Sequence, residues 1–230
     1  MKKIGLLLLA AVAATGFVSC NTTKVDQPSN MSFVTVHTSW LGDYYFETDT
    51  EKRVYPGDKS RVQGYEPKEG PRALITFNVL DTPMPGYDYN VAVYGIGNIP
   101  SSVARVVTDE TELETLKDEA AEFRGGRLLG HWATMIVRYE ASDLSKHKFS
   151  LIVNQAEPSQ TNEGYLDVEL RHDNGGDTPG MLYDTYVSFD MQEIEELLAG
   201  QKGITLRFNN GAAPDYAKLD RLTEETQQTL

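Results

Sequence analysis

Apolar and polar residues alternate in short runs along most of this chain, and this period of two restricts the fold more than any other feature of the sequence. In residues 74–80, for example, Ile75, Phe77 and Val79 would share one face of an extended segment. Such alternation is typical of strands that bury one face and expose the other. Similar runs lie at residues 33–38, 42–48, 89–94, 128–139, 149–153, 166–170, 187–189 and 204–208. The sequence therefore predicts an all-β protein.

The predicted strands form two groups, which we interpret as two domains. The strands of the first group are closely spaced and separated by turns, which predicts a small barrel or sandwich over residues 32–105. The second group predicts an antiparallel β-sandwich over residues 127–211. Residues 212–230 are mostly polar, and we expect them to form a tail outside the sandwich.

Helical spacing interrupts the strand pattern between the two groups. Residues 109–124 place Leu113, Leu116 and Phe123 on one helical stripe, at steps of three and four. Acidic residues in the first turn favour a helix start at this point, and the two glycines that follow are a typical stop. We therefore predict a helical linker over residues 106–126 that connects the two domains.

The first twenty residues have the pattern of a bacterial lipoprotein signal. Lys2 and Lys3 precede an apolar run over residues 4–18, which is shorter than the ~20 residues that a membrane-spanning helix needs. The run leads to Cys20, the only cysteine in the chain. We predict that residues 1–19 form the signal peptide, that Cys20 is lipidated and that residues 20–31 hold this lipidated cysteine and a polar tether. The lipid anchor would then attach the protein to a membrane.

The charge balance argues against nucleic acid as a partner. The chain has 34 acidic and 21 basic residues, which gives a formal net charge of −13. Phosphate backbones attract proteins through Lys and Arg, so an acidic surface repels them. With Cys20 assigned to the lipid, no thiol remains for a disulfide, a cysteine nucleophile or a thiolate metal site. The domains must therefore be held together by their cores.

No motif in the sequence points to catalysis. The chain contains no HExxH, no GxSxG and no Walker loop. His147 and His172 could meet across strands with Asp173 and Asp177 nearby, which would suit a metal. We favour two hydrogen-bonded strand ends instead, because zinc needs three or four oriented ligands. We therefore expect no catalytic residue, no metal and no cofactor.

Aromatic residues are concentrated in the first half of the chain. Trp40, Tyr44, Tyr45 and Tyr87 are our candidate ligand contacts. Exposed aromatic rings on an acidic surface suit a carbohydrate or a protein better than a polyanion. The alternative, which we favour, is that most of these rings pack in the barrel core or around it, since Tyr and Trp are usually substantially buried.

Several short phrases follow one another in an order that is similar to one known family. GDYY at residues 42–45 leads to VYP at residues 54–56, and YEPKEGPR at residues 65–72 precedes an apolar strand. The second half adds KH at residues 146–147, LRH at residues 170–172 and VSFD at residues 187–190. In this order they resemble the NigD-like lipoproteins of Bacteroides-type bacteria over most of residues 40–208.

The resemblance implies a fold and suggests a role. It implies an N-terminal OB-like barrel followed by a C-terminal β-sandwich, which agrees with an all-β chain that has one linking helix. The role proposed for the family is immunity against a bacteriocin, and the resemblance implies no catalytic or binding residue.

From these observations we expect a lipid-anchored cell-envelope protein that acts as a non-catalytic binding or protective module, with a protein or a glycan as its ligand. The alternatives are a carbohydrate-binding accessory lipoprotein and an envelope hydrolase with carboxylate chemistry. Cys20 is followed by Asn-Thr-Thr-Lys rather than by a run of acids of the kind that resembles surface-export signals. We therefore expect the protein on the outer membrane, facing the periplasm.

The predicted anchor can be tested by changing one atom. Cys20→Ser replaces the sulfur that would carry the lipid, so we expect this variant to be soluble or unprocessed. Acyl chains contribute ~0.8 kcal/mol per buried methylene group, so two or more of them would hold the unchanged protein firmly in a membrane. Mass spectrometry of the mature N-terminus checks the prediction. An unmodified N-terminal peptide that begins at another residue would contradict it.

Overall fold

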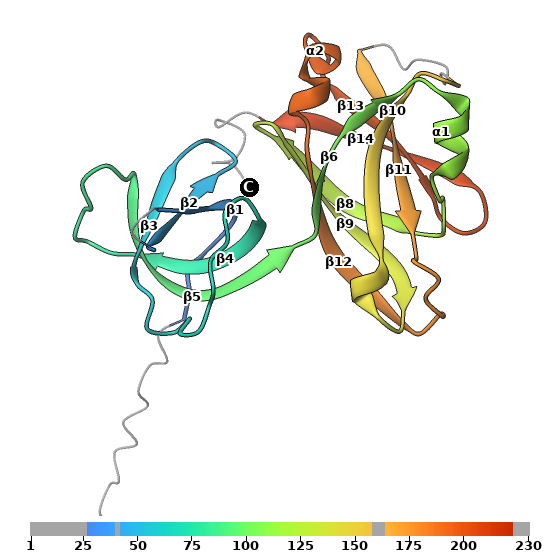
Figure 1. Ribbon diagram of the computed structural model, residues 1–230. Helices are drawn as coiled ribbons and strands as arrows, with labels where there is room; N and C mark the ends of the chain where they lie inside the picture. The colour runs from blue at the N-terminus through green and yellow to red at the C-terminus, as the bar shows by residue number, and fades with distance from the viewer. Residues whose placement is uncertain (1–26, 40–41, 158–163, 223–230) are drawn as a thin grey trace, which may run out of the picture.

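The computed structural model describes residues 27–39, 42–157 and 164–222. Figure 1 shows two β-domains side by side, with the chain passing from the first into the second through one extended segment. The prediction of an all-β protein built from a barrel and a sandwich is confirmed. The predicted signal peptide, Cys20 and Trp40 lie outside the described residues.

The N-terminal domain is a closed five-stranded barrel in the order β1-β2-β3-β5-β4. Its neighbours are antiparallel except for β3 and β5, which are parallel. Inward-facing residues such as Val36, Phe46 and Ile75 fill the interior, because alternation along each strand sends every second side chain there. The strands are β1 (Asn30–Thr38), β2 (Tyr44–Thr48), β3 (Arg53–Asp58), β4 (Arg72–Val79) and β5 (Tyr89–Ile99).

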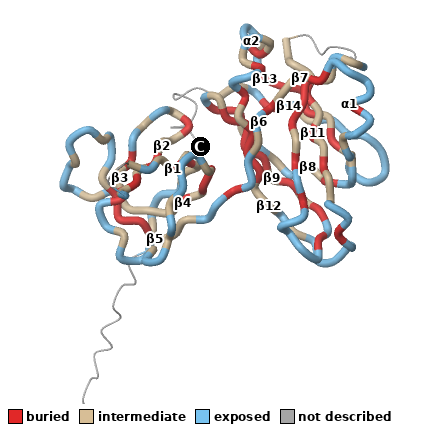
Figure 2. The backbone as a smooth tube through the Cα atoms, in the orientation of Figure 1, coloured by how far each residue is buried: buried red, intermediate tan, exposed pale blue. Residues whose placement is uncertain are grey.

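The C-terminal domain is one nine-stranded sheet in the order β6-β12-β9-β8-β14-β13-β11-β10-β7. It folds over one main core, and Figure 2 shows the buried residues following its inner face. A smaller, separate cluster contains Val107, Leu113 and Ile152. The strands are β6 (Ser101–Val103), β7 (Arg105–Val107), β8 (Glu122–Leu129), β9 (Trp132–Ala141), β10 (Lys148–Asn154), β11 (Tyr165–Asp173), β12 (Met181–Asp190), β13 (Gly203–Asn209) and β14 (Pro214–Leu222). The short helical elements are α1 (Glu110–Thr115), η1 (Leu144–Lys146), η2 (Gln192–Ile194) and α2 (Glu195–Leu198).

Four neighbouring pairs in this sheet are parallel, so it is mixed where the sequence predicted an antiparallel sandwich. These pairs are β10 with β7, β11 with β13, β12 with β6 and β14 with β8. Two of them involve β6 and β7, which are consecutive in the chain but cover opposite edges of the sheet. The buried Ala104 lies between them, and its N–H donates to the carbonyl of Asp190 at 2.8 Å. The chain therefore nearly closes the sheet at this residue.

The predicted helix over residues 109–124 is wrong beyond Thr115. Asp109 caps α1 by accepting from the N–H of Thr111, and the helix then ends after six residues. Residues 116–121, which we call the strap, are instead bonded to the sheet: the N–H of Glu119 donates to the carbonyl of His172 at 2.9 Å. The chain then enters β8, where Phe123 packs near Phe208 with ring centroids 5.8 Å apart. Contacts with the sheet therefore override the helical spacing. The two domains are connected not by a helix but by the extended segment of β5, Pro100 and β6.

The predicted polar tail is also wrong as far as Leu222. Residues 214–222 form β14, which pairs antiparallel with β13 and continues parallel to β8. A tight turn begins this hairpin, because the side chains of Asn209 and Asn210 accept from the N–H groups of Gly211 and Ala212. Only one face of β14 is apolar, with Leu219 buried, so its composition looks like that of a tail.

A buried ion-pair network joins the two domains. Asp49, in the turn after β2, accepts from the Arg72 guanidinium at the start of β4 and from Arg127 on β8. Arg72 has no exposed surface, and its guanidinium lies 4.0 Å from the ring centroid of Trp132 on β9. It also donates to the hydroxyls of Thr35 at 3.1 Å and Ser188 at 3.4 Å. Residues of both domains therefore satisfy this one buried arginine.

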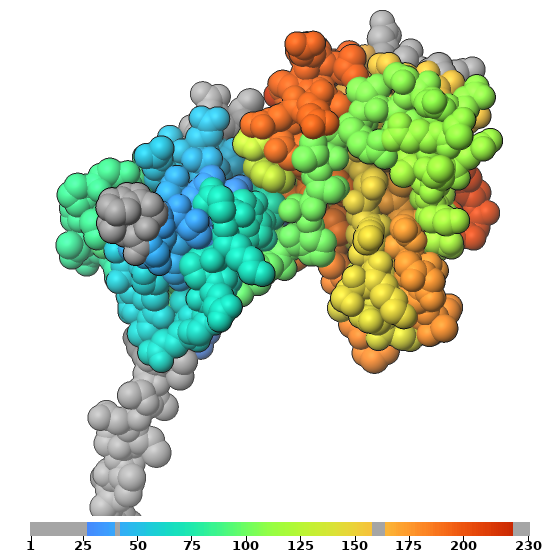
Figure 3. Space-filling model, viewed as in Figure 1, coloured from blue at the N-terminus to red at the C-terminus, as the bar shows by residue number. Residues whose placement is uncertain are grey.

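The joint requires a close approach of the two backbones. Gly130, in the β8–β9 turn, has a φ of +58°, and a Cβ atom there would lie 2.1 Å from the carbonyl oxygen of Asp49. The two domains also meet at the rings of Phe33 and Tyr186, which lie edge to face with centroids 5.1 Å apart. The space-filling view shows the two domains in contact along part of their facing sides (Figure 3).

The joint predicts a large effect for one substitution. Asp49→Asn removes the carboxylate and leaves Arg72 buried without its counter-charge, so we expect unfolding to become easier by roughly 3–5 kcal/mol. Urea-induced unfolding measures this change. The matched control is Asp184→Asn, which breaks the exposed pair with Arg138 and should lower stability by less than ~1 kcal/mol. Equal, small losses in both variants would show that the joint is not held by this charge.

Candidate functional site

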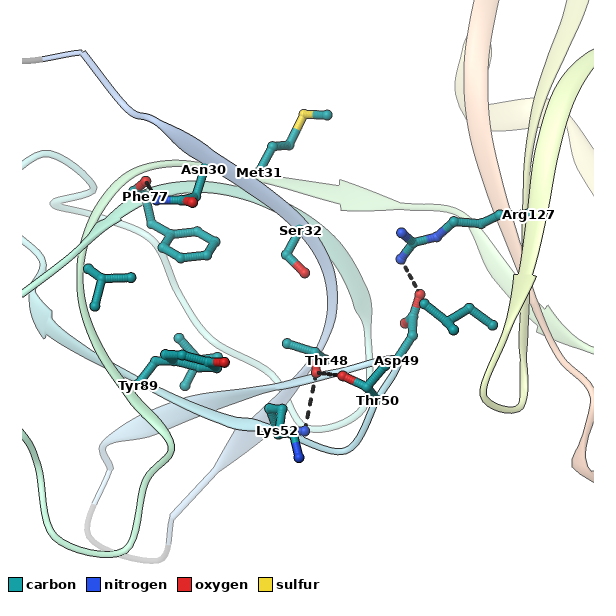
Figure 4. A pocket seen from close by; sticks show the side chains of 13 residues that line it. Asn30, Met31, Ser32, Thr48, Asp49, Thr50, Lys52, Phe77, Tyr89 and Arg127 are labelled. Carbon is teal, nitrogen blue, oxygen red and sulfur yellow. Dashed lines mark hydrogen bonds and ion pairs between the residues drawn. The ribbon is translucent and has the colours of Figure 1, made fainter. Parts of the chain in front are cut away.

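Exposed apolar side chains gather around a cavity at one end of the barrel. Met31 is 60% exposed, Val79 52% and Tyr89 45%, and all three line a cavity of about 310 Å³. Figure 4 shows it as an opening framed by the barrel strands, with Arg127 reaching in from the second domain. We call it the barrel mouth. Its lining is completed by Asn30, Ser32, Thr48, Asp49, Thr50, Lys52, Val54, Phe77, Arg127 and Leu129.

The barrel mouth is open because the strands end at different heights. β1 pairs with β4 from Asn30 onward, but its pairing with β2 begins only at Val34. The first residues of β1 therefore extend beyond β2. Val79 and Tyr89 are the end of β4 and the start of β5, so their side chains also have no strand beyond them to pack against. Strand length, rather than residue pattern, creates this apolar rim.

One wall of the barrel mouth is charged and belongs to the joint between the domains. Arg127 bonds to Asp49 there, and its guanidinium lies 4.6 Å from the ring centroid of Phe33. Asp49 is the one carboxylate among the residues that line this cavity, and two arginines already engage it. General acid–base hydrolysis by a carboxylate pair needs two carboxyl groups across a cleft, and this lining supplies one. The lining therefore does not support that reaction, whereas the exposed rim of Met31, Val79 and Tyr89 can contact an apolar group.

The predicted aromatic contacts divide between the core and the surface of the barrel. Tyr44 is only 7% exposed and packs against Phe46 with ring centroids 5.4 Å apart. Burial is the main cause that raises the pKa of the Tyr44 phenol to about 12. The packing alternative therefore holds for Tyr44, whereas Tyr45 points to the other side of β2.

Tyr45 and Tyr87 belong to a half-buried aromatic row on the outside of the barrel. Tyr45 stacks on His37 with centroids 5.0 Å apart, and Tyr87 contacts both Tyr45 and Tyr55 at centroid distances of 5.8 and 5.0 Å. The planes of Tyr45 and Tyr87 are inclined by 62°, and those of Tyr55 and Tyr87 by 42°. These rings pack on one another and do not form a flat platform. Ligand contact by Tyr45 and Tyr87 stays a prediction.

His147, just before β10, and His172, on β11, do meet. Nδ1 of His147 lies 2.8 Å from Nε2 of His172, and Nε2 of His147 lies 3.3 Å from a carboxylate oxygen of Asp177. Asp177, His147 and His172 therefore form a hydrogen-bonded chain in this order. Asp173 is not part of this chain. Among the residues that the structure describes, no cluster of three or more His, Cys, Asp or Glu side chains could hold a metal ion.

Within the described parts of the chain, no helix is both long enough and apolar enough to cross a membrane.

Comparison with protein families finds two matches, which together extend over most of the described chain. Residues 33–99 match the NigD-like N-terminal OB domain, and residues 110–217 match the NigD-like C-terminal beta sandwich domain. These matches confirm the resemblance seen in the sequence. Comparison with curated proteins finds no match.

Several solved structures share the two-domain fold. A protein of unknown function from Bacteroides vulgatus has a TM-score of 0.69 at 18% identity, with 85% of this chain and 92% of that chain covered. A NigD-like immunity protein from Bacteroides caccae has a TM-score of 0.58 at 17% identity, covering 84% and 93%. A candidate lipoprotein from Bacteroides fragilis has a TM-score of 0.59 at 13% identity, covering 85% and 99%. At these identities the likeness shows the fold alone.

Proposed function

The chain belongs to the NigD-like family, and from this premise we propose that it is a lipid-anchored envelope protein that protects the cell by binding a protein toxin. One feature of the sequence and one structural relative support the proposal. The apolar run that leads to Cys20 supports a lipid anchor. The immunity protein from B. caccae shares the fold, which makes a protective role a reasonable starting point for this chain.

The apolar rim of the barrel mouth is the observation that carries the proposal. Exposed apolar side chains that gather at one place usually mark an interaction site, whereas scattered ones need no explanation. Met and Tyr are also enriched in the centres of protein interfaces. Met31, Val79 and Tyr89 surround a cavity large enough to accept one apolar side chain of a partner, with Phe77 and Leu129 in its lining. This is the geometry of an anchor residue entering a pocket.

The anchor would bring this site close to a membrane. Residues 20–29 connect Cys20 to the start of β1, and ten residues span at most about 35 Å when fully extended. Asn30 lines the barrel mouth, so the site would stay within that reach of the lipid surface. A toxin that crosses or acts on the envelope would meet the protein there.

The aromatic row supports a second candidate, a carbohydrate-binding lipoprotein. OB-folds bind oligosaccharides on the face of their second and third strands, which in this barrel carry Tyr45 and Tyr55. The inclined packing of Tyr45, Tyr55 and Tyr87 disfavours stacking of a sugar on a flat face. We therefore rank glycan binding second, and the hydrolase alternative has no support from the residues of the barrel mouth.

Protection from toxins can be tested in a strain that lacks the protein. We expect it to die in culture supernatants of toxin-producing related strains, and the wild-type chain to restore survival. The double variant Met31→Asp, Val79→Asp should fail, because it places charges on the apolar rim. The matched control is Met181→Asp, Leu182→Asp, which changes apolar residues of similar exposure at the start of β12 and should protect fully. Full protection by the rim variant would exclude the barrel mouth. Loss of protection with Tyr45→Ala, Tyr87→Ala alone would favour the aromatic row.

The side of the membrane is a separate prediction. We expect the protein to face the periplasm, because no acidic run follows Cys20. A protease that cannot enter intact cells should leave the chain whole, and the same protease should digest it after lysis. Digestion on intact cells would place the barrel mouth outside the cell instead.

A further inference from the structure

The histidine pair of the second domain is linked by hydrogen bonds at both of its outer ends. His147 and His172 are 8% and 3% exposed, and their rings lie with centroids 5.1 Å apart at an interplanar angle of 22°. At one end, Nε2 of His147 faces Asp177. At the other, Nδ1 of His172 lies 3.0 Å from the carbonyl oxygen of Ala120 in the strap. The positions of the protons on the two rings follow from whether Asp177 and the carbonyl of Ala120 donate or accept hydrogen bonds.

Both outer partners accept hydrogen bonds. A backbone carbonyl has no proton to give, so Nδ1 of His172 must carry one. The carboxylate of Asp177 accepts from the N–H groups of Ser142 and Asp143 at 2.7 and 2.8 Å, and these bonds hold its pKa well below the ordinary range. Asp177 is therefore ionised, and Nε2 of His147 must donate to it.

The inner contact needs a third proton. Nδ1 of His147 and Nε2 of His172 are 2.8 Å apart, which is a hydrogen-bond distance only if one proton lies between them. Two bare nitrogens would repel each other through their lone pairs, and two N–H groups would collide. The four ring nitrogens therefore carry three protons, whereas two neutral imidazoles carry two.

We propose that His147 and His172 form a buried proton-binding site, in which the pair holds one extra proton as a monocation. This monocation faces one oxygen of Asp177, whose other oxygen lies 3.4 Å from Nζ of Lys146. The charge belongs on His147, because it touches the carboxylate. Consistently, burial is the largest cause that lowers the pKa of His172. Phe149 stacks on His172 with ring centroids 4.6 Å apart, and the centroids of Tyr139 and His147 are 4.7 Å apart. Both histidine rings are therefore largely buried, although His172 also lines a cleft.

The hydrogen-bonded chain that contains this proton links two segments that are distant in the sequence. On one side lies the loop that carries Asp177, and on the other lies the strap, which is one wall of a cleft of about 440 Å³. Loss of the proton, or uptake of a second one, breaks the chain of hydrogen bonds between them. The other charged or titratable groups near the pair and the cleft are Glu119, Glu122, Arg138, Tyr139, Glu140, Asp143, Lys146 and Asp173.

The site predicts a bell-shaped dependence of stability on pH. An unfolded histidine has a pKa of about 6.5, so the two together bind on average one proton at that pH, as many as the native pair. Below it the unfolded chain binds more protons, and stability falls as the pH falls. Above pH 6.5 the native pair binds more protons than the two histidines of the unfolded chain, so stability falls as the pH rises. The contribution of the pair is therefore greatest near pH 6.5, and the unfolding constant changes by up to about tenfold per pH unit on each side.

Two measurements on the full chain test the proposal. Nitrogen NMR of histidine-labelled wild-type protein near neutral pH should show three protonated nitrogens and one bare nitrogen in these two rings, and two bare nitrogens would overturn it. Unfolding between about pH 5 and pH 9 should lose the bell shape in the variant His147→Gln, His172→Gln and keep it in His131→Gln, a half-buried histidine outside the pair. A wild-type contribution that rises to a plateau above neutral pH would also overturn it. The NMR count needs no variant, so it decides the matter even if the double variant does not fold.

Discussion

The carboxylate of Asp49 links the two domains, and the rest of the molecule is arranged around it. Two guanidinium groups from different domains share this one acceptor. Removing such charges from water is unfavourable unless every donor has a partner and the geometry is good. Thr35, Ser188 and the face of Trp132 supply partners for Arg72, so the network is satisfied only in one relative orientation of barrel and sheet. The same network forms one wall of the barrel mouth, which means that the shape of the site depends on the orientation of the domains.

Much of the fold can be read from local pattern, because a half-buried strand records its environment in every second residue. The run at Ile75, Phe77 and Val79 predicts β4 correctly. The same logic misjudges residues 116–124, whose helical spacing yields to backbone bonds with His172 and Asn209. It also misses β14, because a strand with one polar face and few buried residues has the composition of a tail. In both cases the deciding contacts come from residues that are distant in the sequence.

The candidate site was only partly predictable for a related reason. Alternation along β2 separates Tyr44, which points inward, from Tyr45, which points outward, so the division of the predicted aromatics follows from the sequence. The rim formed by Met31, Val79 and Tyr89 does not follow from the sequence pattern, because it depends on where neighbouring strands end. Arg72 lies in the phrase YEPKEGPR that carries the family resemblance, which is the one signal in the sequence that could have pointed to the joint. The meeting of His147 and His172 was expected, but the proton count needs the observed distances.

The two short strands around Ala104 also bear on how the chain can be made. β6 and β7 come first among the strands of the sheet, yet β6 pairs with β12, which lies about eighty residues later in the chain. A polypeptide that emerges N-terminus first can complete its barrel at Ile99 while β6 and β7 still lack their neighbours. The sheet cannot be completed until β14 has emerged, because this last strand lies between β8 and β13. Short edge segments limit the opportunity for other chains to pair with the sheet in the meantime. The order of synthesis thus favours a barrel that folds first, while the sheet is completed only when the last strands of the chain are available.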